Sequence, residues 1–369
     1  MACPSDHANR FGSLIPGRVH AARRGVQAAP RSALALAGRQ GREEGMRRRL
    51  LLGSADLLLA RGAAAQGAAG AWAPDRPVRL LVGFAAGGSS DVTARLVAQA
   101  MSERLGQPVL VENRPGAAGN IAAEAVARAA PDGHTLLFGV SSTLAANRWL
   151  YRTLPFDTLR DFAPLSQVSV IPNLIVVNPQ LPVRSIPELI AYAKANPGRL
   201  NYGSAGAGTS LHMASASFAA RAGLEMVHVP YRGGAPAATD LIAGKIQMIA
   251  SPMVEVVGAV QAGQLRALAV TTARRSPLLP EVPTVAETLP GFEIPLWNGI
   301  LAPAATPPAA VARLSAEIGA ALRTEELRRR LLEQGSEPAP STPEQFADFI
   351  RAEIPRWAEI VRLSGATAD

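Results

Sequence analysis

The sequence predicts an α/β protein in which two series of strands and helices follow one another along the chain. Its 369 residues are 48% hydrophobic, which is enough to bury two cores. From Val78 onward, short apolar runs alternate with longer segments of helical periodicity. Strands that recur at intervals of roughly thirty residues, with helices between them, indicate βαβ units and therefore mostly parallel sheets.

The first series begins at Val78, and Gly, Pro and Asp turns separate its apolar runs. Its expected strands are residues 78–84, 108–113 and 135–140. Its expected helices are residues 91–105, 120–130 and 142–151. Gly106 ends the first of these helices and Pro131-Asp132-Gly133 ends the second, because glycine and proline interrupt helical geometry.

A second series follows residues 173–179 and ends in a proline-rich stretch at 276–292. Its expected strands are 200–204, 226–231, 246–251 and 265–272, and its expected helices are 186–197, 209–223, 235–245 and 253–263. The chain then returns through an extended segment at 293–303 and helices at 307–323 and 342–365. Two series and a returning tail favour two domains that exchange chain segments and enclose a cleft. We expect residues 73–175 with 292–369 in the first domain and residues 176–291 in the second.

The positive charge is concentrated at the start of the chain. Residues 1–71 hold eleven arginines, no lysine and four acidic residues, and so carry seven of the eight net positive charges. The remainder is close to neutral, and a basic groove for nucleic acid is therefore not expected.

The same stretch has the pattern of an export signal. Residues 46–65 contain three consecutive arginines at 47–49, a mostly apolar segment and small residues at 63–65. The arginines and the leucines after them are typical of the twin-arginine route, and Asp56 makes the general secretion route a poorer match, but both stay open. Residues 1–45 lack apolar periodicity, which indicates a start codon assigned too far upstream. A basic tail without an export role is the alternative.

The residue types argue against several kinds of site. Cys3 is the only cysteine and precedes the expected signal, so the exported chain has no disulfide and no thiol nucleophile. Beyond the signal, no apolar run reaches the length of a membrane span. His134, His212 and His228 lack the spacing of metal ligands, although His212 could contact a ligand from the start of its helix. No metal and no cofactor are expected.

Four loops at strand ends are the candidate binding elements, because open α/β sheets bind ligands beyond the carboxyl ends of their strands. They lie at residues 84–91, 112–120, 141–143 and 202–210. Gly-rich turns from strand to helix present unpaired backbone N–H groups, which bind anions. For the loops at 84–91 and 141–143, a capped helix start without a ligand is the alternative.

The sequence of the loop at 202–210 distinguishes between a nucleotide and a carboxylate as the ligand. It has the glycine spacing of a P-loop, but Thr209 stands where the lysine that reaches the phosphates is needed. The dinucleotide fingerprint also fails, because Leu211 replaces its third glycine. Ser204 is not a nucleophile elbow, because Tyr202 replaces the first glycine of that motif. A small carboxylate therefore fits better than a nucleotide, and capture fits better than catalysis.

Long blocks of the sequence match a known family in order and spacing. From about Trp72 to the end they include VRLLVGFAAGGSSDVTARLVA, VLVENRPGAAGNIAAEAVARAAPDGHTLLFG, LNYGSAGAGTSLHMA, VHVPYRGGAPAATDLIAGKIQM and WNGILAPAATPP. The chain thereby resembles the Bug-type periplasmic substrate-binding proteins of tripartite tricarboxylate transporters.

The resemblance implies a type II periplasmic-binding-protein (venus flytrap) fold, with two α/β domains, mostly parallel sheets and a two-segment hinge. It implies a monomer that captures a small organic acid by hinge closure and delivers it to a membrane permease. In that family the first two βα loops hold a carboxylate and the second domain covers the ligand. The implied ligand-binding residues are Phe84, Gly87, Gly88, Ser89, Asp91, Ala118, Gly119, Asn120, Ser141, Ser204, Gly208, Thr209 and Ser251, with Trp297 as a pocket wall.

Two positions depart from the family pattern. Ala86 stands where the family often has proline, which is a mild change. Ser251 stands where many members have an aspartate suited to a ligand's ammonium group, which favours a carboxylate without an amino group. The expected function is solute binding without catalysis. The alternatives are a sensor that docks on a receptor kinase and, as a weaker match, a periplasmic enzyme acting on carboxylated substrates.

Overall fold

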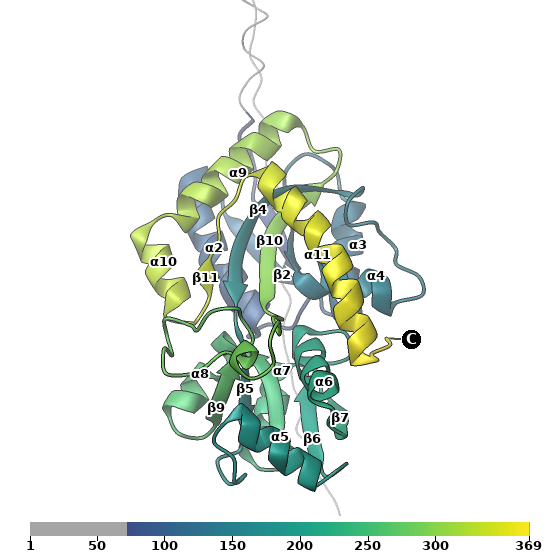
Figure 1. Cartoon of the computed structure of the whole chain (residues 1–369). Coiled ribbons are helices and arrows are strands. Elements are labelled where there is room, and N and C mark those ends of the chain that lie inside the picture. Colours follow the sequence, from purple (N-terminus) through teal and green to yellow (C-terminus); the bar gives the residue numbers. More distant parts are fainter. Residues whose placement is uncertain (1–71, 369) are drawn as a thin grey trace, which may run out of the picture. The chain divides into compact units, whose positions relative to one another are not determined.

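The computed structural model describes residues 72–368 (Figure 1). The expected N-terminal extension (1–45) and export signal (46–65) lie outside the described residues. Among the helices of the described part, none combines the length and apolar character needed to cross a membrane.

The first lobe contains a six-stranded sheet in the order β11-β4-β10-β3-β1-β2. Strands β1 to β4 run parallel to one another, and β10 and β11 run antiparallel to them. The strands are β1 (Val78–Val82), β2 (Val109–Asn113), β3 (Thr135–Val140), β4 (Phe162–Ile171), β10 (Leu296–Pro303) and β11 (Glu337–Pro338). The helices of this lobe are α2 (Ser89–Leu105), α3 (Asn120–Ala127), α4 (Asn147–Leu150), α9 (Pro308–Leu322), α10 (Glu325–Leu332) and α11 (Pro343–Ser364).

The second lobe contains a five-stranded sheet in the order β7-β6-β8-β5-β9, in which only β5 is antiparallel to the rest. The strands are β5 (Asn173–Val177), β6 (Leu200–Ser204), β7 (Met226–Pro230), β8 (Met248–Pro252) and β9 (Arg266–Val270). The helices are α5 (Ile186–Ala195), α6 (Ser210–Ala222), α7 (Gly234–Ile242) and α8 (Met253–Gln261).

Apart from β11 at the edge of the first sheet, the two sheets share one strand order. In each, the strand that follows a crossing between the lobes, β10 or β5, is inserted antiparallel beside the third strand of a parallel set. The expected α/β class with mostly parallel strands is confirmed. Strand β5 starts at Asn173 and lies wholly in the second sheet, so residues 173–175 pair there although the expected division assigned them to the first domain.

Local chemistry explains where α2 begins and ends. Strand β1 is buried because Val78, Leu80 and Val82 pack against α2 and α9. Gly87 has φ +82°, a left-handed conformation that favours glycine, and it turns the chain into the helix. Gly106 at φ +68° ends the helix, and its N–H is donated to the Ser102 carbonyl oxygen.

Strand β4 and the helix expected at 142–151 are among the elements that differ from expectation. Strand β4 was not anticipated, because Pro164 and its serines and glutamine dilute the apolar alternation of FAPLSQVSVI. The single helix expected at 142–151 is divided into a wide π-type turn, Ser142–Ala146, followed by α4. Such turns widen the backbone locally and are frequent beside functional sites.

The lobes are joined by two chain crossings that are hydrogen-bonded to each other. The chain passes from β4 to β5 at Pro172 and returns through residues 292–295 to β10. The Asn173 side chain and the Thr271 hydroxyl both donate to the carbonyl oxygen of Ile294, each at 2.8 Å. Helix α11 of the first lobe also packs against α6 of the second (Figure 1).

Candidate ligand-binding cleft

A cavity of about 750 Å³ lies where loops from both lobes face one another, within the size range of small-molecule sites. Its lining comes from the carboxyl ends of strands in both sheets and from the starts of the helices that follow them. These residues are 83–90, 115–118, Val140, Ser142 and Tyr151 from the first lobe, 205–207, 209–211, 232–236 and Glu255 from the second, together with Leu296 and Ala368.

The β1–α2 loop forms one wall of the cleft and is held by Asp91. Oδ2 of Asp91 accepts the Gly87 N–H at 2.9 Å, and Oδ1 accepts the Asn113 amide at 2.9 Å. Burial disfavours the charged carboxylate, but the bonds from Arg95, Gly87 and Asn113 outweigh burial and lower the pKa of Asp91. Asp91 therefore holds the loop in place through these hydrogen bonds, and it does not line the cleft.

The β2–α3 loop forms an adjoining wall with an uncommon backbone. Ala117 and Ala118 have φ of +47° and +49°, which costs free energy for residues with a side chain. The carbonyl oxygen of Ala118 accepts hydrogen bonds from the Thr143 hydroxyl at 2.9 Å and the Asn147 amide at 3.1 Å. Gly119 is required here, because a Cβ at this position would overlap the Thr143 hydroxyl. The π-type turn thus supports the strained loop.

The opposite wall is the β6–α6 loop of the second lobe. Thr209 caps α6 by accepting the His212 N–H, and it also donates its hydroxyl to the Gly206 carbonyl oxygen at 2.8 Å. The Gly206 N–H is donated to the Ser204 hydroxyl at 3.1 Å, and Ser204 in turn bonds His228 Nε2 at 2.7 Å. Ser204 is fully buried, so this Ser–His pair positions the loop and does not face the cleft.

Two side chains give the cleft its charge. Among its lining residues, Glu255 and Arg232 are the charged ones, and the rest are mainly glycine, alanine and serine. Burial raises the pKa of Glu255, although hydrogen bonds from Ser89 and Ser251 act in the opposite direction. Within residues 72–368, no group of three or more His, Cys, Asp or Glu side chains is close enough to hold a metal ion.

The fourteen expected binding residues fall into two groups, those that line the cleft and those that do not. Phe84, Gly87, Gly88, Ser89, Ala118 and Thr209 line the cleft. The others do not line it, and most support those that do: Asp91, Gly119, Asn120, Ser141, Ser204, Gly208, Ser251 and Trp297. Asn120 accepts a bond of 2.6 Å from the Asn147 amide, and Gly208 donates its N–H to His212 Nδ1 at 3.2 Å. Ser141 is fully buried, and no hydrogen bond to its hydroxyl is found among the described residues.

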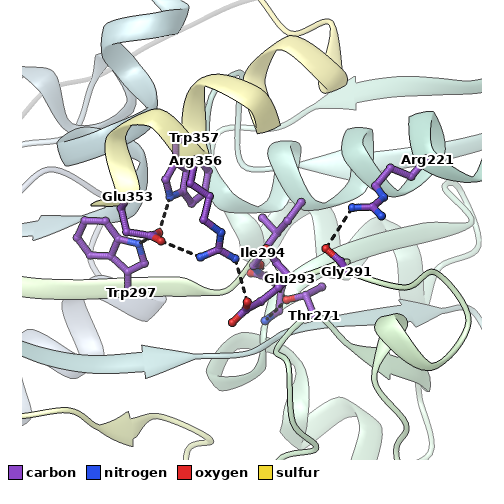
Figure 2. Close-up of polar contacts among 10 residues, drawn as sticks. Arg221, Thr271, Gly291, Glu293, Ile294, Trp297, Glu353, Arg356 and Trp357 are labelled. Atoms are coloured by element: carbon purple, nitrogen blue, oxygen red, sulfur yellow. Dashed lines mark hydrogen bonds and ion pairs between the residues drawn. The ribbon is translucent and has the colours of Figure 1, made fainter. Parts of the chain in front are cut away.

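Trp297 lies in the core of the first lobe, not at the cleft. Its indole N–H is donated to Glu353 Oε2 at 2.7 Å, and Trp357 donates to the same oxygen at 2.9 Å (Figure 2). Arg356 completes the cluster with a bond of 2.7 Å to Glu353 Oε1. The cluster lies beside the returning crossing, because Arg356 also bonds the Glu293 carbonyl oxygen.

Sequence reasoning missed the part of the lining at the starts of α7 and α8, and also Tyr151 after α4 in the first lobe. Tyr151, Arg232, Gly233, Gly234 and Glu255 all face the cleft. The dipeptide Gly233-Gly234 at the start of α7 was an available signal, since it repeats the Gly-Gly pattern of the β1–α2 loop. Glu255 has no comparable sequence signal: it lies in the first turn of α8, four residues after Ser251 at the end of β8.

Comparison with known proteins identifies this arrangement. The family described as "Tripartite tricarboxylate transporter family receptor" (TctC) matches residues 93–365, which is well over half of the chain. The chain belongs to this receptor family. The expected resemblance is thereby confirmed.

Solved structures of the receptor family agree over nearly their whole length. Rpa4515 of R. palustris with adipate is 38% identical, with a TM-score of 0.77 over 80% of this chain and 99% of that chain. The periplasmic binding protein BugD is 32% identical, with a TM-score of 0.75 over 80% and 99%. MatC from Rhodopseudomonas palustris with bound malate is 34% identical, with a TM-score of 0.73 over 78% and 99%. The expected two-lobed periplasmic-binding-protein fold is confirmed.

Proposed function

We propose that this receptor captures a small organic acid in the cleft between its lobes and delivers it to a membrane permease of the tripartite tricarboxylate type. The observation that carries the proposal is the lining, in which the starts of α2, α6 and α7 meet across one cavity of about 750 Å³. Related structures contain adipate and malate, both small carboxylates, which supports the same ligand class here.

The energetics favour capture by many weak contacts. A helix N-terminus stabilises an anion by about 0.3 to 1 kcal/mol, and micromolar binding requires about 8 kcal/mol. Neutral hydrogen bonds and exclusion of water by both lobes must therefore provide most of the affinity. No step of catalysis is proposed, because the Ser204–His228 pair lies outside the cleft lining.

The cellular setting belongs to the same proposal. We infer that the chain is exported, works as a monomer in the periplasm and binds neither a cofactor nor nucleic acid. The BugD structure, described as a periplasmic binding protein, supports this location. The twin-arginine motif at residues 47–51 supports the export route.

Gly88 provides a direct test of the binding site. It adopts an extended conformation that any residue can take, and a Cβ added there would lie 3.7 Å from Glu255 Oε1. Gly88→Trp should therefore fill the cleft without straining the backbone. We expect adipate or malate to raise the melting temperature of the wild type and to leave that of Gly88→Trp unchanged.

Gly258→Trp is the matched control, because a Cβ at Gly258 meets open space on α8. This variant should keep the wild-type shift. The proposal is wrong if a broad panel of carboxylates leaves the wild type unshifted, or if Gly88→Trp responds as the wild type does.

A further inference from the structure

Glu255 forms a hydrogen bond that crosses the cleft from one lobe to the other. It lies in the first turn of α8 in the second lobe, and its Oε1 accepts the backbone N–H of Ser89, at the start of α2 in the first lobe, at 3.0 Å. Its Oε2 accepts the hydroxyl hydrogen of Ser251 at 3.1 Å. The same carboxylate thus contacts both walls of the cavity.

The carboxylate of Glu255 lies beside the N-termini of two helices, where unpaired backbone N–H groups stabilise an anion. Helix α2 begins after Gly88, which offers no side-chain cap, so the Ser89 N–H depends on an acceptor from elsewhere. Helix α7 also begins without a side-chain cap, and Gly234 lies so close to Glu255 that a Cβ there would overlap Oε2. Two uncapped helix starts from different lobes therefore face one internal carboxylate.

The surrounding charges do not neutralise Glu255. Among described residues, no ion pair to Glu255 is found, and the other charged residue that lines the cleft is Arg232, two residues before the start of α7. Asp91 lies in the first turn of α2, but its carboxylate is held by Arg95 and Gly87. Tyr151 is the remaining titratable group of the lining. A second carboxylate that entered the cavity near Glu255 would therefore be repelled by the charge of Glu255.

We propose that Glu255 is a specificity-determining residue that competes, as an internal carboxylate, with the ligand's carboxylate for the N-terminus of α2. This inference rests on the proposed function. A ligand anion gains access to Ser89 either by displacing the ionised Glu255 or by binding beside its protonated form. The competition lowers affinity for anions at neutral pH and excludes acids whose remaining contacts are too few to overcome it.

The position also revises the expectation drawn from Ser251. The absence of an aspartate there favoured a ligand without an amino group. Ser251, in β8, instead donates its hydroxyl to Glu255, so a carboxylate is present four residues later, in the first turn of α8. The loss of the aspartate therefore does not leave this part of the cleft without a carboxylate.

Glu255→Gln keeps the shape of the side chain and an oxygen that can accept from Ser89, but removes the negative charge. We expect isothermal titration calorimetry at about pH 8 to show at least about tenfold tighter binding of adipate and malate to Glu255→Gln, because two carboxylates a few ångströms apart repel by more than about 1.4 kcal/mol. Glu255→Ala, which removes the competitor altogether, should show an equal or larger gain. Glu281→Gln removes one negative charge from an exposed loop position of the second lobe and should bind as the wild type does.

A pH series separates this role from a merely structural one. As pH falls from about 8 to about 5, the wild type should approach Glu255→Gln in affinity, because protonated Glu255 is as uncharged as glutamine. The ligand's own titration is common to both proteins and cancels in the comparison. Weaker binding by Glu255→Gln, or an affinity ratio that does not change with pH, would overturn the inference. If neither protein binds any carboxylate, the proposed function itself fails.

Discussion

At the residue scale, Trp297 and Glu353 show how a buried charge is accommodated. Glu353 is 5% exposed, and its two oxygens accept from Trp297, Trp357 and Arg356 (Figure 2). A buried carboxylate is tolerated only when such donors replace water. Trp297 therefore stabilises the first lobe beside the returning crossing, and the pocket-wall role expected from the resemblance finds no support in the cavity lining.

Trp297→Phe removes one of these donors while keeping an aromatic ring. We expect the free energy of unfolding to fall by about 1 to 3 kcal/mol, because a buried acceptor loses a partner that water cannot replace. Urea unfolding followed by circular dichroism measures the change.

Trp149→Phe is the matched control for this substitution. Trp149 is 46% exposed and donates its indole N–H to the Ile354 carbonyl oxygen at 3.0 Å, where water can take its place. Its loss should be clearly smaller. Equal losses in the two variants would contradict the role given to Glu353.

At the scale of elements, a stack of three rings supports the β6–α6 loop from behind. Tyr202 on β6, His228 on β7 and His212 on α6 lie nearly parallel, with ring centroids 5.1 Å apart for Tyr202 and His228 and 4.0 Å apart for the two histidines. Burial, and to a lesser degree the nearby His228, lowers the pKa of His212 to about 4. Burial also lowers the pKa of His228.

The lowered pKa of His212 makes the folded state sensitive to acid. In the unfolded chain a histidine has a pKa of about 6.5, so on acidification the unfolded state binds the proton first. The contribution of His212 to the free energy of unfolding should be fully present above about pH 6.5. It should be lost as the pH falls from there to about 4, which lowers the free energy of unfolding by on the order of 3 kcal/mol. Chemical unfolding at a series of pH values measures this slope.

His212→Asn tests the assignment, because asparagine does not titrate and its oxygen can accept the Gly208 N–H in place of Nδ1. The variant should be less stable at neutral pH and show a shallower acid slope. Tyr202→Phe keeps the stacked ring and leaves both histidines in place, so it should keep the wild-type slope. An unchanged slope in His212→Asn would show that other groups cause the acid sensitivity.

At the scale of the whole described molecule, two crossings and the α6–α11 contact connect the lobes. Arg221 on α6 donates to the carbonyl oxygens of Pro290 and Gly291, while Arg356 on α11 bonds Glu293 in the same segment (Figure 2). The returning chain is thus attached to a helix of each lobe. The chain crosses between the lobes at Pro172 and within residues 292–295.

Ligand capture by both lobes has a measurable signature in hydrogen exchange. Adipate should slow exchange at residues 84–90 of the first lobe and at residues 205–211 of the second in the same titration, because both segments line one cavity. Gly88→Trp should show neither change. Protection confined to the first lobe would mean that the second lobe does not cover the ligand.

The elements differ in how well local sequence predicts them. The βα alternation, the Gly-rich loops and the ends of α2 follow from residues whose chemistry acts on their immediate neighbours, such as Gly87 and Gly106. Strand β4 escaped prediction because its pairing with β10 and β11, not its own alternation, makes it a strand. The same holds for β11, whose two residues are a strand only beside β4.

The sequence by itself determined the α/β class, the family and the loops that form the cleft, because each depends on local periodicity or on ordered motifs. Only the tertiary structure decided which loop residues face the cavity and which support it. It placed Asp91 behind the first loop, Trp297 in the core and Glu255 opposite Ser89. The physical reason is that Ser89 and Glu255 are 166 residues apart in the chain, and their hydrogen bond exists only because two separate sheets bring a helix start and a helix turn together.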